Sequence, residues 1–459
     1  MSSNLNAKKA TKINLFSFST AAMRAFHMSW LAFFVCFFAW FACAPLMPVI
    51  AGEFHLTKDQ IANINIAAVA ITILVRLIVG PLCDKYGPRK TYTALLLIGA
   101  IPVFGVACAN SYESFLFFRL LIGAIGASFV ITQYHTSIMF APNVVGTANA
   151  TTAGWGNAGG GATQALMPLL LSALVMFGVE QALGWRIALI VPGLMMVIVG
   201  IMYWKLTQDA PQGNFKELRA QGITVGSDKK GGMAILMHAA KNYRVWILFG
   251  AYAACFGIEI FIHNIVAMYY VDNFKFGLKE AGMAAGIFGL LALFARALGG
   301  IVSDKVATKK GLDGRTKVLF IMILMEGLFL IVFSQMNTPM LAILSMTVFA
   351  LFTHMACGAT YALVPFIDRD ALGGVAGIIG AGGNVGAVAA GFLLKGMLDI
   401  QTTLMVLGGL VVIAASCVLM IRFSVEHKEK EQKLFEAAVL ERERLEQSAT
   451  ATLKSNTAA

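Results

Sequence analysis

The stretch RLIVGPLCDKYGPRK, from Arg76 to Lys90, decides the fold, because RALGGIVSDKVATKK, from Arg296 to Lys310, repeats its pattern. In both copies an arginine stands eight residues before an aspartate (84 − 76 = 8 and 304 − 296 = 8), and a lysine follows that aspartate directly. Each copy ends an apolar run and begins a charged loop that closes on two adjacent basic residues. One unit used twice along the chain predicts an internal duplication.

The composition indicates a protein that lives in lipid. Of the 459 residues, 58% are hydrophobic and 13% are charged, whereas a soluble domain carries about 25% charged residues. The net charge of +11 does not indicate nucleic-acid binding, because the basic residues lie in short loops between apolar runs, as membrane orientation requires. The seven cysteines lack metal-ligand spacing. We therefore predict no metal, no cofactor and no enzymatic activity.

The apolar runs divide the chain into two matching halves. Twelve runs are each long enough to cross a bilayer, which predicts an all-α integral membrane protein with 12 transmembrane helices. We expect an N-terminal segment 1–27, a six-helix half 28–206, a linker 207–244, a second half 245–423 and a charged tail 424–459. Lysine and arginine concentrate in alternate loops. This bias predicts a multi-pass protein of the inner (cytoplasmic) membrane with both termini in the cytoplasm.

Two arginines are expected near the middle of the bilayer. Asp84 and Asp304 begin charged loops and so mark the membrane interface. Arg76 and Arg296, eight residues earlier, then lie about 12 Å deeper, close to half of a hydrocarbon core of about 30 Å. Such arginines keep their charge, and burying each one costs at least about 2.5 kcal/mol. They form either two structural salt bridges or an anion site between the halves, and the repeat symmetry favours the anion site.

Two glycine-rich spans occupy equivalent places in the halves. AGWGNAGGGATQ contains Gly156 and Asn157, and GIIGAGGNVGAVAAG contains Gly383 and Asn384. Small residues at this density let helices approach closely. Packing alone does not explain the asparagines, because a buried amide needs hydrogen-bond partners. Beside an arginine, each amide can donate to an oxyanion.

Several motifs resemble a known family. Gly80, Asp84 and Arg89, with Asp304 in the second copy, resemble the loop motif of the major facilitator superfamily. GWGNAGGG (154–161) and GAGGNVG (380–386) resemble the paired signatures of its nitrate/nitrite porters. The first span and CFGIEIFIHN (255–264) are similar to the proton-coupled branch of that family. The resemblance covers nearly the whole chain and implies a secondary transporter of nitrate or nitrite with a major facilitator fold.

The resemblance also implies roles for particular residues. The two arginines would hold the substrate, Asn157 and Tyr252 would add hydrogen bonds, and Phe129 and Phe256 would line the pocket. Cys43 departs from the family, which often has a pocket phenylalanine there. A planar guanidinium suits a planar, trigonal oxyanion, and glycine walls leave little room for sugars. The predicted substrate-binding residues are Arg76, Arg296, Asn157, Tyr252, Phe129, Phe256, Gly156, Asn384 and Gly383.

Energetics constrain how an anion is imported. Moving one negative charge inward against the membrane potential costs about 2.3 kcal/mol per 100 mV, so import requires exchange for nitrite or co-transport of protons. Glu259 lies two helical turns after Tyr252, and His263 lies one turn further. The resemblance to the proton-coupled branch favours proton symport, with Glu259 and His263 as candidate coupling residues. The alternatives are that Glu259 only pairs with a buried arginine and that His263 is a packing residue. Arg119, in FRLLIGAIGAS, resembles the arginine of the superfamily's Arg-x-x-x-Gly element, which implies that it either pairs structurally or assists coupling.

Other buried polar residues are given structural roles. We expect His135 and His354 to be packing residues, and Glu326 to neutralise an arginine or face a wet crevice. The tail after Ser424 is predicted to be a solvated helix with a narrow stripe at Leu434, Ala438 and Leu445.

Alternative functions remain open at this point. The chain could be a nitrate/nitrite antiporter, a major facilitator for another small anion, or a transporter-derived membrane sensor signalling through its tail. The expected partners are nitrate or nitrite, protons and membrane lipid, with no nucleic acid, and we expect a monomer.

Overall fold

The computed structural model describes residues 9–140, 144–223, 232–368, 372–396 and 399–433, which are nearly all helical. Within these residues, twelve helical segments are long and apolar enough to cross a membrane. The prediction of an all-α protein with 12 membrane spans is therefore confirmed. The spans are Ala21–Glu53, Lys58–Arg76, Pro88–Val106, Tyr112–Met139, Thr147–Met176, Gln181–Leu206, Tyr243–Phe274, Leu278–Ala307, Lys309–Ser334, Pro339–Leu363, Gly374–Gly396 and Ile400–Val418.

The first six spans form the N-terminal half. Two of its spans are completed by short 3₁₀ segments, η1 (Ala44–Leu46) and η2 (Gly123–Ala127). Its α-helices are α1 (Ala21–Phe41), α2 (Met47–Glu53), α3 (Lys58–Tyr86), α4 (Pro88–Val106), α5 (Tyr112–Ile122), α6 (Ser128–Met139), α7 (Val145–Met176) and α8 (Gln181–Leu206).

A linker with two short helices leads to the C-terminal half. The linker helices are α9 (Phe215–Ala220) and α10 (Gly232–Ala240). The second half contains α11 (Tyr243–Tyr252), the π-helical turn η3 (Ala253–Gly257), α12 (Ile258–Phe274), α13 (Leu278–Leu290), α14 (Ala292–Ser334), α15 (Pro339–Leu363), η4 (Val364–Phe366), α16 (Leu372–Gly396) and α17 (Ile400–Val418).

Local sequence signals set the helix ends. The first helix begins at Ala21 rather than near residue 28, because the side chain of Thr20 accepts the backbone N–H of Met23 and caps it. In α14, the backbone of Gly311 has φ 56° and ψ −146°, so this element contains the end of one span and all of the next, joined at a sharp turn. Glycine tolerates that conformation without steric cost. The turn at Gly311 therefore separates two membrane spans, as the predicted duplication requires.

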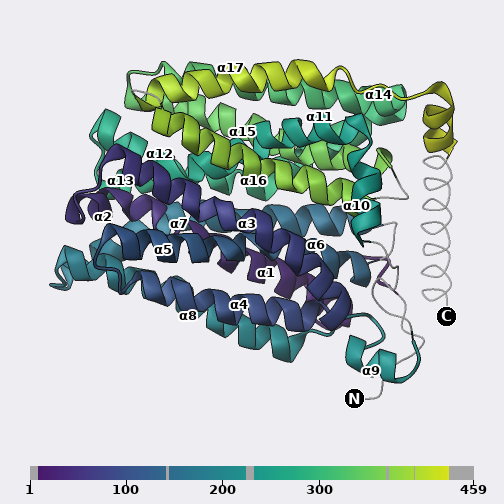
Figure 1. Cartoon of the computed structure of the whole chain (residues 1–459), viewed down its shortest axis with the longest axis horizontal. Helices are drawn as coiled ribbons and strands as arrows, with labels where there is room; N and C mark the ends of the chain where they lie inside the picture. Colours follow the sequence, from purple (N-terminus) through teal and green to yellow (C-terminus); the bar gives the residue numbers. More distant parts are fainter. Residues whose placement is uncertain (1–8, 141–143, 224–231, 369–371, 397–398, 434–459) are drawn as a thin grey trace, which may run out of the picture.

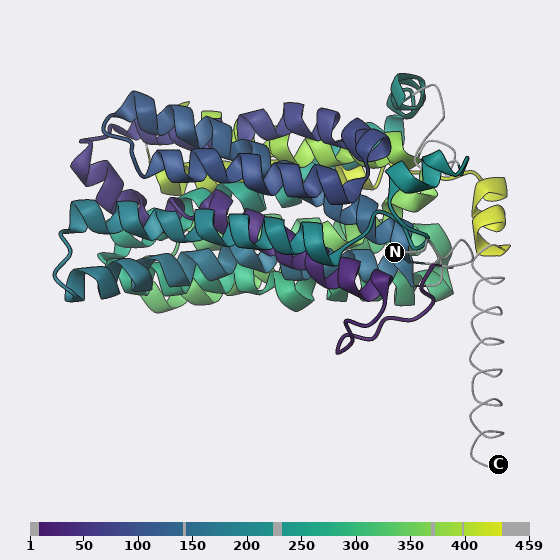
Figure 2. The ribbon, with the colours of Figure 1, turned by 90° about the horizontal axis from the view of Figure 1, so that it is seen from below.

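The two halves lie side by side along the bundle. In Figures 1 and 2 all the spans run roughly along the long axis, with the linker helices α9 and α10 at one end. The halves meet where α3 packs against α16 and where α7 packs against α13 and α14. We call this contact the seam. The two glycine-rich spans, α7 and α16, therefore both lie on it.

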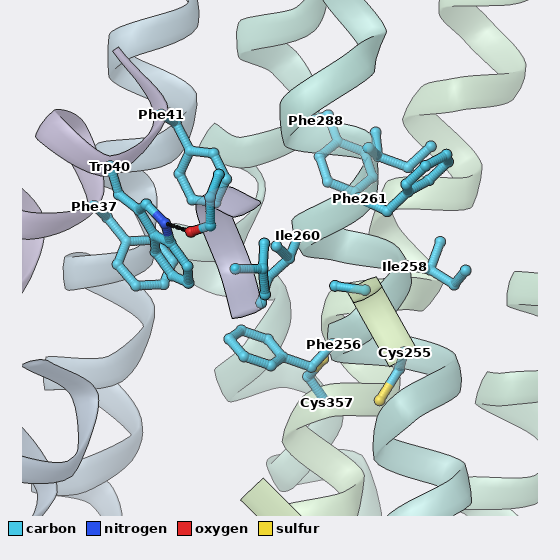
Figure 3. Packing of buried hydrophobic residues seen from close by; sticks show 14 of the residues in the cluster. Phe37, Trp40, Phe41, Cys255, Phe256, Ile258, Ile260, Phe261, Phe288 and Cys357 are labelled. Carbon is cyan, nitrogen blue, oxygen red and sulfur yellow. Dashed lines mark hydrogen bonds between the residues drawn. The ribbon is translucent and has the colours of Figure 1, made fainter. Parts of the chain in front are cut away.

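A hydrophobic core crosses the seam. Phe37, Trp40 and Phe41 of α1 belong to the same buried cluster as Phe256 and Phe288 of the other half, as Figure 3 shows. The indole N–H of Trp40 donates to the carbonyl oxygen of Ala68 at 2.6 Å, and this pairing satisfies a polar group that lipid could not. The predicted tail residues Leu434, Ala438 and Leu445 lie outside the described residues.

Candidate anion site at the seam

Two buried arginines meet beside one aromatic ring. Arg76 of α3 and Arg296 of α14 are both buried. Their Cζ atoms lie 5.7 and 5.4 Å from the ring centroid of Phe256, in η3. The structure therefore brings together two residues that are 220 positions apart (296 − 76), one from each half.

Arg76 reaches across the seam to α16. Its Nη1 donates to the carbonyl oxygen of Gly380 at 3.0 Å, and its Nη2 donates to that of Gly126 at 3.3 Å. Its Cζ also lies 5.8 Å from the ring centroid of Phe129. Both hydrogen-bond acceptors are neutral, so neither balances the charge of the guanidinium.

Arg296 reaches across the seam in the opposite direction, to α7. The amide of Asn157, turned so that its oxygen faces the donors, accepts from Nε, Nη1 and Nη2 of Arg296 at 2.8, 3.0 and 2.7 Å. On the same guanidinium, Nη2 lies 2.5 Å from Oε2 of Glu259. Unlike Arg76, Arg296 thus has a carboxylate partner as well as an amide partner.

Aromatic side chains line the two arginines. Tyr252 stacks on Phe256 with ring centroids 5.0 Å apart, and both are buried. Tyr361 of α15 lies edge-on to Tyr252 and to Phe129, with centroid distances of 5.1 and 5.9 Å. Sequence reasoning missed Tyr361. The available signal was a lone tyrosine in the apolar run 340–367, and nothing in the sequence distinguishes it from an ordinary packing residue.

The π-helical turn η3 lies where α11 and α12 press against α16. A Cβ on Gly257 would meet backbone atoms of Gly383, Gly386 and Ala387 at 2.9 Å. A Cβ on Gly383 would overlap the ring of Phe256 and meet Tyr252 Cδ1 at 3.1 Å. The glycines of α16 therefore set the position of the aromatic wall, and π-turns of this kind are frequent at functional sites.

The remaining substrate-binding predictions fall in different places. Gly156 faces the ring of Phe33 on α1, where an added Cβ would overlap it, so this glycine serves helix packing. Asn384 is fully buried, and among the described residues neither atom of its amide has a hydrogen-bond partner. The structure thus pairs only one of the two repeat-related asparagines with an arginine.

The two predicted coupling residues, Glu259 and His263, have different surroundings. Glu259 belongs to the site because its carboxylate forms an ion pair with Arg296. His263 packs between Phe41 and Phe288, with ring centroids 4.8 and 5.3 Å away. The histidine within ion-pair distance of Glu259 is instead His354, whose Nδ1 lies 3.5 Å from Oε2.

His135 has the packing role that the sequence predicted. It is fully buried. Its Nδ1 contacts Tyr203 Oη at 2.5 Å, and its Nε2 contacts the carbonyl oxygen of Gln208 at 2.8 Å. Both partners are neutral and belong to the N-terminal half and the start of the linker. His135 therefore joins α6 to α8 and lies apart from the two arginines.

Among the described residues, neither Arg119 nor Glu326 forms a hydrogen bond or ion pair with Arg76 or Arg296. Arg119 is fully buried and donates to the carbonyl of Trp40 at 2.8 Å and to Oδ1 of Asn264 at 3.1 Å. It thereby connects α5 with α1 and, across the seam, with α12. The prediction for Glu326 is wrong: it is fully buried, and neither carboxyl oxygen has a hydrogen-bond partner among the described residues. It neither neutralises an arginine nor faces water, because packing within the C-terminal half encloses it.

The repeated loop motif lies at the linker end of the spans. Gly87 has φ 87°, and its backbone passes against Asp209, whose carboxylate accepts the N–H groups of Arg89 and Phe215 at 2.8 and 3.0 Å. Burial raises the pKa of Asp209, although those two N–H groups oppose the shift. In the second copy Asp304 pairs with Arg315 at 2.5 Å. The side chain of Asp84 lies outside the described residues.

The chain is similar in sequence to known membrane transporters. The sequence profile of the Major Facilitator Superfamily matches residues 29–363 and again residues 264–456. High affinity nitrate transporter 2.5 of Arabidopsis thaliana is 40% identical over 409 residues, which cover 89% of this chain and 81% of the plant protein. Nitrate transporter 2.1 of Chlamydomonas reinhardtii is 38% identical over 83% of this chain and 69% of the algal protein.

A cyanobacterial protein and two solved structures extend the likeness. Nitrate/nitrite transporter NrtP of Nostoc punctiforme is 28% identical over 82% of this chain and 87% of its own length. The inward-facing, unoccupied bacterial homologue of the human lysosomal transporter Spinster has a TM-score of 0.67 at 15% identity, covering 88% of this chain and 97% of that one. A mutant of the nucleoside transporter NupG has a TM-score of 0.61 at 14% identity, covering 86% and 99%. At this identity the structures support the fold alone.

Proposed function

Because the chain belongs to the nitrate/nitrite porter family of the major facilitator superfamily, we propose that it is a secondary transporter that moves nitrate or nitrite across the membrane. The observation that carries the proposal is the pair of buried guanidinium groups, Arg76 and Arg296, beside the ring of Phe256. Two planar forks, one from each half, suit a small planar oxyanion.

The charge of the site fits a monovalent anion. Arg296 is paired with the carboxylate of Glu259, whereas the two acceptors of Arg76 are neutral carbonyls. A buried charge needs a counter-charge. In the empty site, two guanidinium groups and one carboxylate leave one positive charge over, and this charge attracts a nitrate or nitrite ion.

The position of the site supports alternating access. Each arginine crosses the seam to the glycine-rich helix of the other half: Arg76 to α16 through Gly380, and Arg296 to α7 through Asn157. A rocking motion of one half against the other would break and remake these contacts around the anion. The halves 28–206 and 245–423 are the moving units in this proposal.

We propose further that nitrate enters with protons. Glu259 and nitrate compete for the same guanidinium, since Oε2 of Glu259 lies 2.5 Å from Nη2 of Arg296. Protonating Glu259 removes its negative charge and releases Arg296 to the anion. Exchange for nitrite needs no such group, so the buried carboxylate favours symport over antiport.

The orientation of the chain follows from its loops. Basic residues concentrate at the end that carries the linker helices α9 and α10. By the positive-inside rule, this end and both termini face the cytoplasm, and the protein belongs to the inner (cytoplasmic) membrane.

The experiment that tests the transport proposal is counterflow of labelled nitrate in proteoliposomes. Vesicles preloaded with unlabelled nitrate should accumulate the label transiently without any pH gradient, and nitrite should compete. Equal accumulation with vesicles that contain the Arg76→Lys, Arg296→Lys double variant would contradict the proposal. If uptake needs internal nitrite and ignores a pH gradient, the chain is an antiporter.

A further inference from the structure

A backbone carbonyl group determines which ring nitrogen of His354, on α15, carries a hydrogen. The side chain is fully buried, and Nε2 lies 2.9 Å from the carbonyl oxygen of Phe288. A carbonyl oxygen only accepts hydrogen bonds, so Nε2 must carry a hydrogen. In neutral His354 the lone pair is therefore on Nδ1.

That lone pair faces the carboxylate of Glu259. Nδ1 of His354 lies 3.5 Å from Oε2 of Glu259. Among the described residues, Nδ1 of His354 and Oε1 of Glu259 are both buried without a hydrogen-bond partner. Two basic groups thus stand close together inside the protein, and each has room for one proton.

We propose that His354 is the second proton-carrying residue of the transport cycle, and that Glu259 and His354 together bind two protons with each anion. This inference rests on the proposed symport. One proton converts the Glu259 carboxylate to the acid, which leaves Arg296 to the incoming nitrate. The other proton binds Nδ1 of His354 and forms an imidazolium ion.

The charges of this step balance. In the empty site, two guanidinium groups and one carboxylate sum to +1. In the loaded site, two guanidinium groups, one imidazolium ion, one nitrate and a neutral Glu259 sum to +2. One net positive charge moves inward with each nitrate, so the membrane potential drives uptake instead of opposing it.

Other ionisable groups surround Glu259, but their geometry differs. Cys357 Sγ lies 3.5 Å from Oε2 of Glu259, and as a thiol it can donate a hydrogen bond to it. His263 lies between two phenylalanine rings, tilted against Phe41 and edge-on to Phe288. Around Glu259 the groups are Arg296 and Glu326 from α14, His354 and Cys357 from α15, and His263 from α12 itself.

The test measures how uptake depends on membrane potential. In proteoliposomes with a fixed inward proton gradient, an imposed potential of about 100 mV, inside negative, should raise nitrate accumulation by wild-type protein roughly fifty-fold for one net charge. In His354→Gln the glutamine amide can still donate to the carbonyl of Phe288. Accumulation by this variant should still respond to the pH gradient but no longer to the potential, because only Glu259 then carries a proton.

Controls separate this result from damage to the protein and from failure of the proposed function. His354→Gln should still catalyse nitrate counterflow, which needs no net movement of protons and therefore reports that the variant is folded and alternates. His135→Gln, at a buried histidine with neutral partners, should keep the response to potential. A His354→Gln variant whose uptake still rises with potential would overturn the proposal. So would wild-type uptake that carries no net charge per nitrate, a measurement that stands even if the variant fails to fold.

Discussion

The amide oxygen of Asn157, in the N-terminal half, lies 2.7 Å from Nη2 of Arg296, in the C-terminal half. The two residues are joined across the seam, and Glu259 holds the same guanidinium through its carboxylate. An anion that enters the site therefore meets one arginine that is already engaged and one, Arg76, that is bound only to carbonyl groups. Because the two arginines have different partners, the contribution of each partner can be tested by replacing one residue at a time.

Replacing either arginine with lysine should strongly weaken nitrate binding. Lysine keeps the positive charge but loses the bidentate fork, and one hydrogen bond to a charged group is worth about 1.5–3 kcal/mol, or roughly ten- to hundred-fold in affinity. Nitrate binding to purified Arg76→Lys and Arg296→Lys measures the loss. Arg186→Lys is the matched control, because Arg186 pairs with Glu53 at a partly exposed position. Normal affinity in either site variant would contradict the proposed site.

Removing the amide of Asn157 should weaken binding less than removing an arginine. Asn157→Ala leaves Arg296 held by Glu259 alone, and we expect roughly a tenfold loss of nitrate affinity from a less ordered guanidinium. Asn384→Ala tests the predicted role of the repeat-related amide, which has no partner among the described residues. If Asn384 serves the substrate, its loss should also lower affinity; unchanged binding would remove it from the site.

Glu259→Gln should separate proton coupling from anion binding. The amide cannot gain or lose a proton in the relevant pH range, so uptake driven by a pH gradient should be abolished while nitrate counterflow persists. For wild-type protein, uptake should accelerate at acidic external pH. Retention of pH-driven uptake by the variant would exclude Glu259 as a proton carrier and favour exchange for nitrite.

Enlarging Gly160 should block movement without blocking insertion. A Cβ at this position would meet His263 Cε1 across the seam at 3.1 Å and Phe41 Cδ2 of its own half at 3.4 Å. Gly160→Leu should therefore reach the membrane at normal levels yet transport no nitrate. Gly409→Leu on α17, where a Cβ would meet open space, should transport normally. Wild-type flux in Gly160→Leu would mean that the seam tolerates bulk there.

Gly87→Ala should destabilise the linker end of the N-terminal half. The residue has φ 87°, and an added Cβ would overlap the carboxylate of Asp209. With ψ 153°, this backbone lies in a positive-φ region that is essentially restricted to glycine and costs an alanine about 1–3 kcal/mol, so thermal unfolding of the purified protein should begin at a lower temperature. Gly80→Ala, inside α3 where nothing lies within 4 Å, should not lower that temperature, because alanine favours a helix interior more than glycine does. An unaffected Gly87→Ala variant would show that the loop adjusts freely.

The spans, the duplication and the family could all be predicted from the sequence. A membrane span must satisfy its backbone hydrogen bonds within its own helix, so its length and apolarity are local properties that the sequence states directly. The spacing between Arg76 and Asp84, repeated at Arg296 and Asp304, likewise predicts the depth of both arginines from helical rise alone. None of this requires knowing which helix lies beside which.

The partners of the buried side chains were decided only by the tertiary structure. Helical spacing places His263 one turn from Glu259, yet packing turns its ring toward Phe41 and Phe288. His354, which is 95 residues away (354 − 259), approaches the carboxylate instead. Helix packing likewise places Tyr361 beside Tyr252 at the site. It brings Asn157 to Arg296, whereas the amide of Asn384 has no hydrogen-bond partner among the described residues. How each helix is rotated about its axis depends on the shapes of its neighbours, such as the glycines of α7 and α16, and no single span encodes that rotation.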